Sequence, residues 1–79
     1  MKLSVYSLKK ILFQGEAELL NCKTSMGEIT VLDNHETFIG VLKSGVIKIV
    51  DKAKQEHFFP VASGFLEVRE GNEARCLVD

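Results

Sequence analysis

The sequence predicts an all-β domain, built as a sandwich or a barrel, and two observations carry this prediction. Short segments with strand character follow one another along the whole chain, and glycines separate them about every eight to twelve residues. No stretch has sustained helical spacing, because the best candidate, between residues 6 and 13, is long enough for only one turn. The predicted strands cover residues 3–6, 10–13, 17–23, 28–32, 38–42, 46–51, 57–62, 65–69 and 74–78.

Two of these strands alternate most clearly between their two faces, as strands of a layered sheet do. Ile47 and Ile49 share one face of the sixth predicted strand. In the eighth, Leu66 and Val68 point one way and are predicted to enter the core. Phe65 then lies on the polar face, where an exposed aromatic side chain can anchor a partner.

Length, composition and charge limit the class of protein. The 79 residues suit a single domain, 1–79, and 46% apolar with 27% charged residues argues against a disordered chain. Ten basic and eleven acidic residues give a net charge of -1 without a basic stripe, which argues against nucleic-acid binding. No apolar run approaches a membrane span or a secretory signal, so we expect a cytoplasmic setting.

The residues that carry chemistry in other proteins form no recognisable site here. Cys22 and Cys76 are far apart without a CxxC pair, which predicts two buried, reduced thiols and no zinc site. His35 follows a turn and His57 lies in a strand, and both read as surface histidines. Neither a nucleophile elbow nor a phosphate-binding glycine loop is present, so we expect no enzyme, no metal and no cofactor.

Several blocks occur in an order and at spacings that resemble a known family. They are Phe13-Gln14-Gly15, Gly27 to His35, Leu42 to Val50, Ala62 to Val68, and Gly71-Asn72. Together they resemble the N-terminal β-sandwich of the epsilon subunit of rotary ATP synthases. The resemblance runs without a gap over nearly the whole chain, which makes it specific although no single block is decisive.

The resemblance implies a flattened β-sandwich of two five-stranded sheets, with about ten short strands. It also implies a non-catalytic rotor subunit that links the gamma subunit to the c-ring and couples ion flow to ATP synthesis. Such a subunit is peripheral to the membrane, on the cytoplasmic face of a bacterial inner membrane. Family members usually continue into a helical hairpin, and this sequence stops before one, at Asp79. If this is the natural end of the chain, we expect a protein that couples without inhibiting through that hairpin; the sequence does not separate a short natural form from a shortened one.

The resemblance also assigns residues to the polar loops of the c-ring. The ring-facing positions of the family correspond to Ser7, Glu28 and His35. Glu28 suits this role chemically, because the ring loops of the family carry a basic residue and a carboxylate accepts charge-assisted hydrogen bonds from it.

A second set of positions corresponds to the side that packs on the gamma subunit. These are Gly40, Val46, Ala62 and Glu67. Gly40 and Ala62 are small, which would let another backbone approach closely. Glu67 shares the polar face with Phe65, a combination typical of interfaces.

The last predicted strand needs an adjustment to the family pattern. Residues 70–73 have the composition of a hairpin turn. Ala74, Cys76 and Val78 reach inward positions only if this turn is one residue longer than in the family. We predict the longer turn, and Arg75 in the core would contradict it.

An alternative function belongs to a different class. Asp51-Lys52-Ala53 lies between two strands and resembles the modified turn of lipoyl domains, where an exposed lysine is acylated. This alternative predicts a swinging-arm carrier modified on Lys52. Against it, a charged run follows the lysine, as at any solvated hairpin tip, and the chain is not symmetric about this turn.

Overall fold

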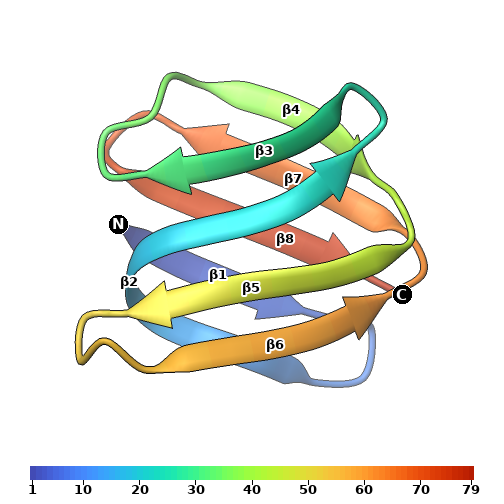
Figure 1. Ribbon diagram of the computed structural model, residues 1–79, viewed down its shortest axis with the longest axis horizontal. Helices are drawn as coiled ribbons and strands as arrows, with labels where there is room; N and C mark the ends of the chain where they lie inside the picture. Colours follow the sequence, from blue (N-terminus) through green and yellow to red (C-terminus); the bar gives the residue numbers. More distant parts are fainter.

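The computed structural model describes all residues, 1–79, and consists of strands without a helix (Figure 1). It therefore contains no helix that could span a membrane. The eight strands are β1 (Lys2–Tyr6), β2 (Ile11–Thr24), β3 (Gly27–Leu32), β4 (Phe38–Leu42), β5 (Gly45–Asp51), β6 (Glu56–Val61), β7 (Gly64–Arg69) and β8 (Glu73–Val78).

The strands form two layers that share β2, and this confirms the predicted all-β sandwich (Figure 1). Sheet I contains the first half of β2, then β1, β8, β7 and β4 in that order. Sheet II has the order β3, second half of β2, β5 and β6. All pairings are antiparallel except that of β1 with β8.

The structure has eight strands where nine were predicted from the segments and about ten from the resemblance, because two of the nine predicted strands are one. The segments 10–13 and 17–23 join into the 14-residue β2. Pairing with β1 continues through Gly15, which lies opposite Leu3, so this glycine does not end the strand. No helical turn forms at residues 7–10; this loop is held by the Ser7 hydroxyl, which accepts hydrogen bonds from the backbone N–H groups of Lys9 and Lys10.

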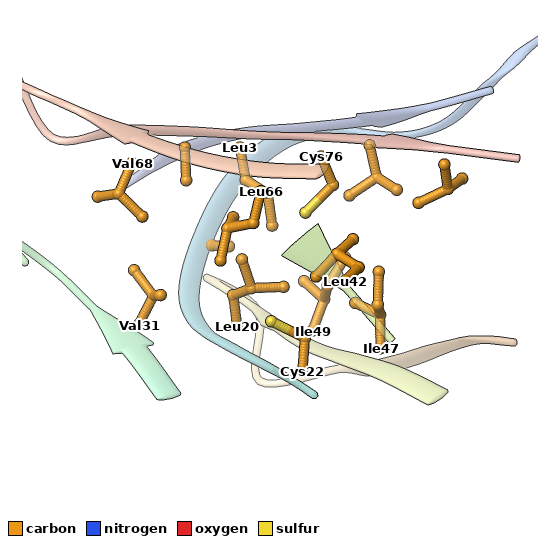
Figure 2. Packing of buried hydrophobic residues seen from close by; sticks show 14 of the residues in the cluster. Leu3, Leu20, Cys22, Val31, Leu42, Ile47, Ile49, Leu66, Val68 and Cys76 are labelled. Atoms are coloured by element: carbon orange, nitrogen blue, oxygen red, sulfur yellow. The ribbon is translucent and has the colours of Figure 1, made fainter. Parts of the chain in front are cut away.

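The core lies between the layers and follows the predicted alternation. Figure 2 shows side chains of the two sheets pointing toward one another, among them Leu66 and Cys76 from sheet I and Leu20 and Ile49 from sheet II. Both cysteines are free and buried, as predicted. The cluster contains Met1, Leu3, Val5, Ala17, Leu20, Cys22, Val31, Leu42, Ile47, Ile49, Val61, Leu66, Val68, Ala74, Cys76 and Val78.

The last hairpin has the predicted inward residues. Gly71 and Asn72 form the turn with φ values of 85° and 59°, a region that glycine and asparagine tolerate best. Ala74, Cys76 and Val78 are buried, and Arg75 is at the surface. The longer turn is therefore consistent with the structure, which keeps Arg75 out of the core.

The loops gather at two opposite ends of the sandwich (Figure 1). One end, on the right of the figure, holds residues 7–10, 25–26, 43–44 and 62–63; we call it the Glu28 end. The other holds the N-terminus, the β3–β4 loop, the β5–β6 turn and the β7–β8 turn; we call it the Asp33 end.

Candidate functional site

The β2–β3 turn at the Glu28 end is fixed by a buried hydroxyl. Thr24 is only 3% exposed, and its Oγ1 donates to Gly27 O at 2.8 Å and accepts from Met26 N at 3.1 Å. Ser25 N donates to Val41 O at 2.9 Å, which ties the turn to β4. The strand that carries Glu28 therefore starts from a defined backbone position.

Glu28 projects from β3 on the outer face of sheet II and is exposed. Its Oε2 accepts a hydrogen bond from Asn21 Nδ2 at 3.0 Å. No cation of the chain pairs with it: Glu28 is absent from every ion pair, although Lys23 lies directly opposite on β2. This carboxylate is thus oriented by an amide and has no ion-pair partner in the chain.

The structure brings only two of the three predicted ring-facing residues to one end. Ser7 follows β1 and lies at the Glu28 end, although on the other sheet. His35 lies in the β3–β4 loop at the Asp33 end, separated from Glu28 by the length of β3. Its Nδ1 contacts Glu36 O at 2.7 Å, a carbonyl that only a protonated nitrogen can satisfy.

A single carboxylate joins the loops of the Asp33 end. Asp33 accepts hydrogen bonds from the Met1 amine, from Asn72 Nδ2 at 3.3 Å and from Lys52 Nζ at 3.4 Å. These donors, the amine first, hold the pKa of Asp33 at about 2. No local sequence pattern indicates this cluster, because its members are distant along the chain.

The turn that carries Lys52 is closed by its own side chains. Asp51 Oδ1 accepts from Ala53 N at 2.9 Å and Gln55 N at 3.0 Å, and Asp51 Oδ2 lies 2.8 Å from His57 Nε2. The hydrogen bond with His57, followed by that with Gln55 N, lowers the pKa of Asp51. Lys52 itself pairs with Asp33, so its ammonium has a role in joining two loops.

The outer face of sheet I carries an exposed apolar row. Strand register aligns Val41, Phe65, Leu77 and Tyr6 side by side across β4, β7, β8 and β1. Phe65 is 57% exposed, as the sequence predicted for a residue on the polar face. Val41 and Leu77 were not predicted to join this row, although the alternation of their strands places them on the same outward face.

Glu67 lies beside this row and is half-buried. Its Oε1 accepts from Arg75 Nη2 at 2.7 Å, which lowers the pKa of Glu67. Two hollows flank it: one of about 490 Å³ lined by Ile39 and Arg69 among others, and one of about 310 Å³ lined by Phe65 and Arg75 among others. The surface around Glu67 is therefore contoured and mixed in polarity.

The remaining predicted gamma-facing residues do not share this surface. Gly40 points inward, opposite Leu66, and a Cβ there would lie 2.5 Å from the Phe38 ring, so its smallness serves the interior. The interior thus accounts for the absence of a side chain at Gly40, and its contact with the gamma subunit stays a prediction. Val46 lies on the outer face of sheet II, and Ala62 lies in the exposed β6–β7 turn.

No group of three or more His, Cys, Asp or Glu side chains gathers as metal ligands. Burial raises the pKa of Cys22 to about 11 and that of Cys76 to about 12, so neither thiol is poised as a nucleophile. Two surfaces remain as candidates for recognition: the Glu28 end and the apolar outer face of sheet I.

Comparison with solved structures shows the same fold in two protozoan assemblies. A structure of Euglena gracilis mitochondrial ATP synthase that includes its c-ring superposes with a TM-score of 0.91 at 18% identity, over 99% of this chain and 49% of that chain. The central stalk and c-ring of Tetrahymena thermophila mitochondrial ATP synthase gives 0.83 at 17% identity, over 99% and 62%.

Curated relatives carry one description. The ATP synthase epsilon chain of Clostridium novyi is 40% identical over 68 residues, covering 85% of this chain and 51% of the relative. That of Brevibacillus brevis is 29% identical over 79 residues, covering 100% and 59%. The chain thus spans little more than half the length of these relatives. The family described as the β-sandwich domain of the ATP synthase delta/epsilon chain matches residues 1–79, and the chain belongs to this family.

Proposed function

We propose that this chain is a non-catalytic central-stalk subunit of an ATP synthase, linking the gamma subunit to the c-ring and coupling ion flow to ATP synthesis. The observation that carries the proposal is the match of the whole chain to the delta/epsilon β-sandwich family. Its structural relatives belong to assemblies described with a c-ring or a central stalk. A close-packed sandwich suits the transmission of torque, because its interior deforms little.

The outer face of sheet I is the surface that we assign to the gamma subunit. Its apolar row is exposed without a partner in the chain, and the ion pair of Glu67 with Arg75 adjoins it. Interfaces combine an apolar centre with a polar rim in this way. Glu67 is the predicted contact that this face supports best, with Phe65 beside it.

The Glu28 end is the part that we assign to the polar loops of the c-ring. Glu28 offers an unpaired carboxylate there, and Ser7 lies at the same end. A rotor subunit with these two surfaces would be peripheral to the membrane through the complex, on the cytoplasmic face of a bacterial inner membrane. The bacterial origin of the curated relatives supports a bacterial source for this chain.

The swinging-arm carrier is not supported. The family match covers the β5–β6 turn together with the rest of the chain, and the Lys52 ammonium is paired with Asp33. A carrier lysine must instead be free for an acylating enzyme.

A pull-down with purified gamma subunit and c-ring tests the proposal, combined with intact mass spectrometry of the chain. We expect gamma subunit to be retained and the mass to be unmodified. Loss of gamma retention together with a lipoyl mass on Lys52 would establish the carrier instead. Phe65→Ala is the matched negative control, because it removes the exposed ring and leaves the core intact.

A further inference from the structure

The Asn21–Glu28 contact has a feature that ordinary surface pairing does not explain. Glu28 lies directly opposite Lys23 on β2, where a cross-strand ion pair would be expected. Its carboxylate instead reaches the diagonal neighbour Asn21, which is paired with Thr30. The carboxylate of Glu28 therefore accepts from the neutral amide of Asn21, although the cation of Lys23 is its directly opposite neighbour in the strand register.

The amide of Asn21 is oriented by three acceptors on β3. Its Nδ2 donates to Glu28 Oε2 at 3.0 Å, to Thr30 Oγ1 at 2.9 Å and to Ile29 O at 3.3 Å. The carboxylate and the carbonyl can only accept, so the NH₂ group and not the amide oxygen must face β3. Both hydrogens are thus engaged, and the side chain is fixed on a central strand of sheet II.

The two lysines nearest to this amide are directed elsewhere. The methylene groups of Lys23 lie over Gly45 on β5, where a Cβ would meet its Cδ at 3.2 Å. Lys48, opposite Asn21 on β5, pairs with Glu56 at 3.3 Å. Gly45 leaves room for the methylene groups of Lys23. The ion pair with Glu56 draws the Lys48 ammonium toward β6, away from β3. Glu28 consequently keeps its charge uncompensated.

We propose that Asn21 is a positioning residue, whose neutral amide fixes the Glu28 carboxylate without neutralising it, so that Oε1 remains open to a cation of the docking partner. Oε1 accepts no hydrogen bond from the chain. An ion pair with Lys23 would orient the carboxylate equally well but would compete with the partner for its charge. The inference rests on the proposed function, in which the partner at this end is a basic polar loop of the c-ring.

The expected energetic effect is one of preorganisation. An unheld glutamate loses rotamer freedom when it binds, and this costs a factor of about 3 to 10 in affinity for one immobilised side chain. Asn21→Ala should therefore weaken binding of the chain–gamma complex to c-rings by about that factor. Asn21→Asp, which keeps the shape but replaces the donor by a second carboxylate, should weaken it more.

Two measurements separate this inference from the proposed function. Three-bond NMR couplings of the Glu28 side chain, in the chain alone, report whether one rotamer dominates. We expect one rotamer in the wild type and averaging in Asn21→Ala. Binding to detergent-solubilised c-rings is then measured for Asn21→Ala in the wild-type and Glu28→Gln backgrounds. The loss should fall below about twofold in the second background, because Asn21 acts through Glu28.

Thr30→Ser is the matched control. It keeps the hydroxyl that accepts from the Asn21 amide, removes only a methyl group, and should leave both the Glu28 rotamer and the affinity unchanged. Unaltered Glu28 couplings in Asn21→Ala would overturn the inference, whatever affinity for c-rings is measured. Equal losses in both backgrounds would overturn it too, by showing a structural effect. A wild-type complex that does not bind c-rings would instead contradict the proposed function, while the couplings still report on Asn21.

Discussion

The ring of Phe38 fills the space that a side chain at Gly40 would need. Both residues point inward from β4, two positions apart on the same face. A Cβ at Gly40 would lie 2.5 Å from Cε2 and 2.7 Å from Cζ of this ring. Phe38 in turn packs against the core cluster, so it cannot move outward without uncovering apolar surface.

Gly40→Ala should therefore lower the free energy of unfolding by about 1–3 kcal/mol, the usual cost of overpacking. Urea denaturation measures this change. Phe38→Leu in the same chain should recover part of the loss, because the two residues share one space and their effects are not additive. Gly40→Ala with unchanged stability but weaker gamma binding would place the glycine in the interface after all.

Phe65 and Phe58 offer a test of which face binds the gamma subunit. The two rings are 57% and 56% exposed, but Phe65 lies on the outer face of sheet I and Phe58 on that of sheet II. Phe65→Ala should weaken gamma binding by about tenfold or more, as for a central aromatic anchor. Phe58→Ala should leave it unchanged. Isothermal titration calorimetry with gamma subunit gives both affinities.

The two variants should lose similar amounts of stability, because each removes an equally exposed ring from a sheet surface. A difference between their affinities for the gamma subunit therefore reports on the interface. A larger effect of Phe58→Ala would move the gamma-binding surface to sheet II, the face on which Val46 lies.

Features that depend on neighbouring residues could be predicted from the sequence, whereas features that depend on contacts between distant segments could not. Alternation identified Leu66 and Val68 as core and placed Ile47 and Ile49 on one face, which the structure buries, because a strand's period is local. The same alternation in residues 38–42 indicates that Gly40 points inward, whereas only its correspondence to a family position suggests contact with the gamma subunit. Placement at the two ends could not be predicted, because it depends on which strands pair.

The cluster around Asp33 shows that limit most clearly. Asp33 meets Met1, Lys52 and Asn72 only after the N-terminus and three separate loops have reached one end of the sandwich. Nothing in the local pattern of residues 32–37 distinguishes this aspartate from one in an ordinary turn. Its importance follows from topology and not from composition.

The charge of Asp33 predicts an acid-sensitive contribution to stability. The Met1 amine, Asn72 and Lys52 lower its pKa from 3.8 to about 2 in the folded chain. A carboxylate with a depressed folded pKa stabilises the fold above its unfolded pKa, and this contribution disappears as the pH falls through the folded value. Asp33→Asn should thus unfold at a lower temperature at pH 7, and its difference from wild type should vanish between pH 3.8 and about 2. A difference that persists at pH 2 would show that the effect is not electrostatic.

The buried thiols should be inert in the folded chain. Burial raises the pKa of Cys76 to about 12, so almost no thiolate exists at pH 8, and the core excludes reagents. Iodoacetamide at pH 8 should leave the native mass unchanged and should label both cysteines in denaturing urea. Rapid labelling of the native chain would show that the sandwich opens locally between its sheets.

Gly64 and Gly15 share one backbone conformation but differ in their surroundings. Both have φ of 159°. A Cβ at Gly64 would collide with the carbonyl oxygen of Leu77 and would lie 3.0 Å from Val78 Cα, both backbone atoms of β8. A Cβ at Gly15 would meet no atom within 4 Å.

Alanine at each position therefore separates a conformational cost from a steric one. The conformational cost of alanine at this φ is common to both variants, whereas only Gly64→Ala forces β7 and β8 apart. We expect Gly64→Ala to be less stable than Gly15→Ala by about 2 kcal/mol or more in urea denaturation. Because Phe65 and Leu77 adjoin this contact in the apolar row, Gly64→Ala should also weaken gamma binding, and Gly15→Ala should not. Equal stabilities would mean that backbone conformation alone selects glycine here, and that the close approach of β7 to β8 is not a constraint on the fold.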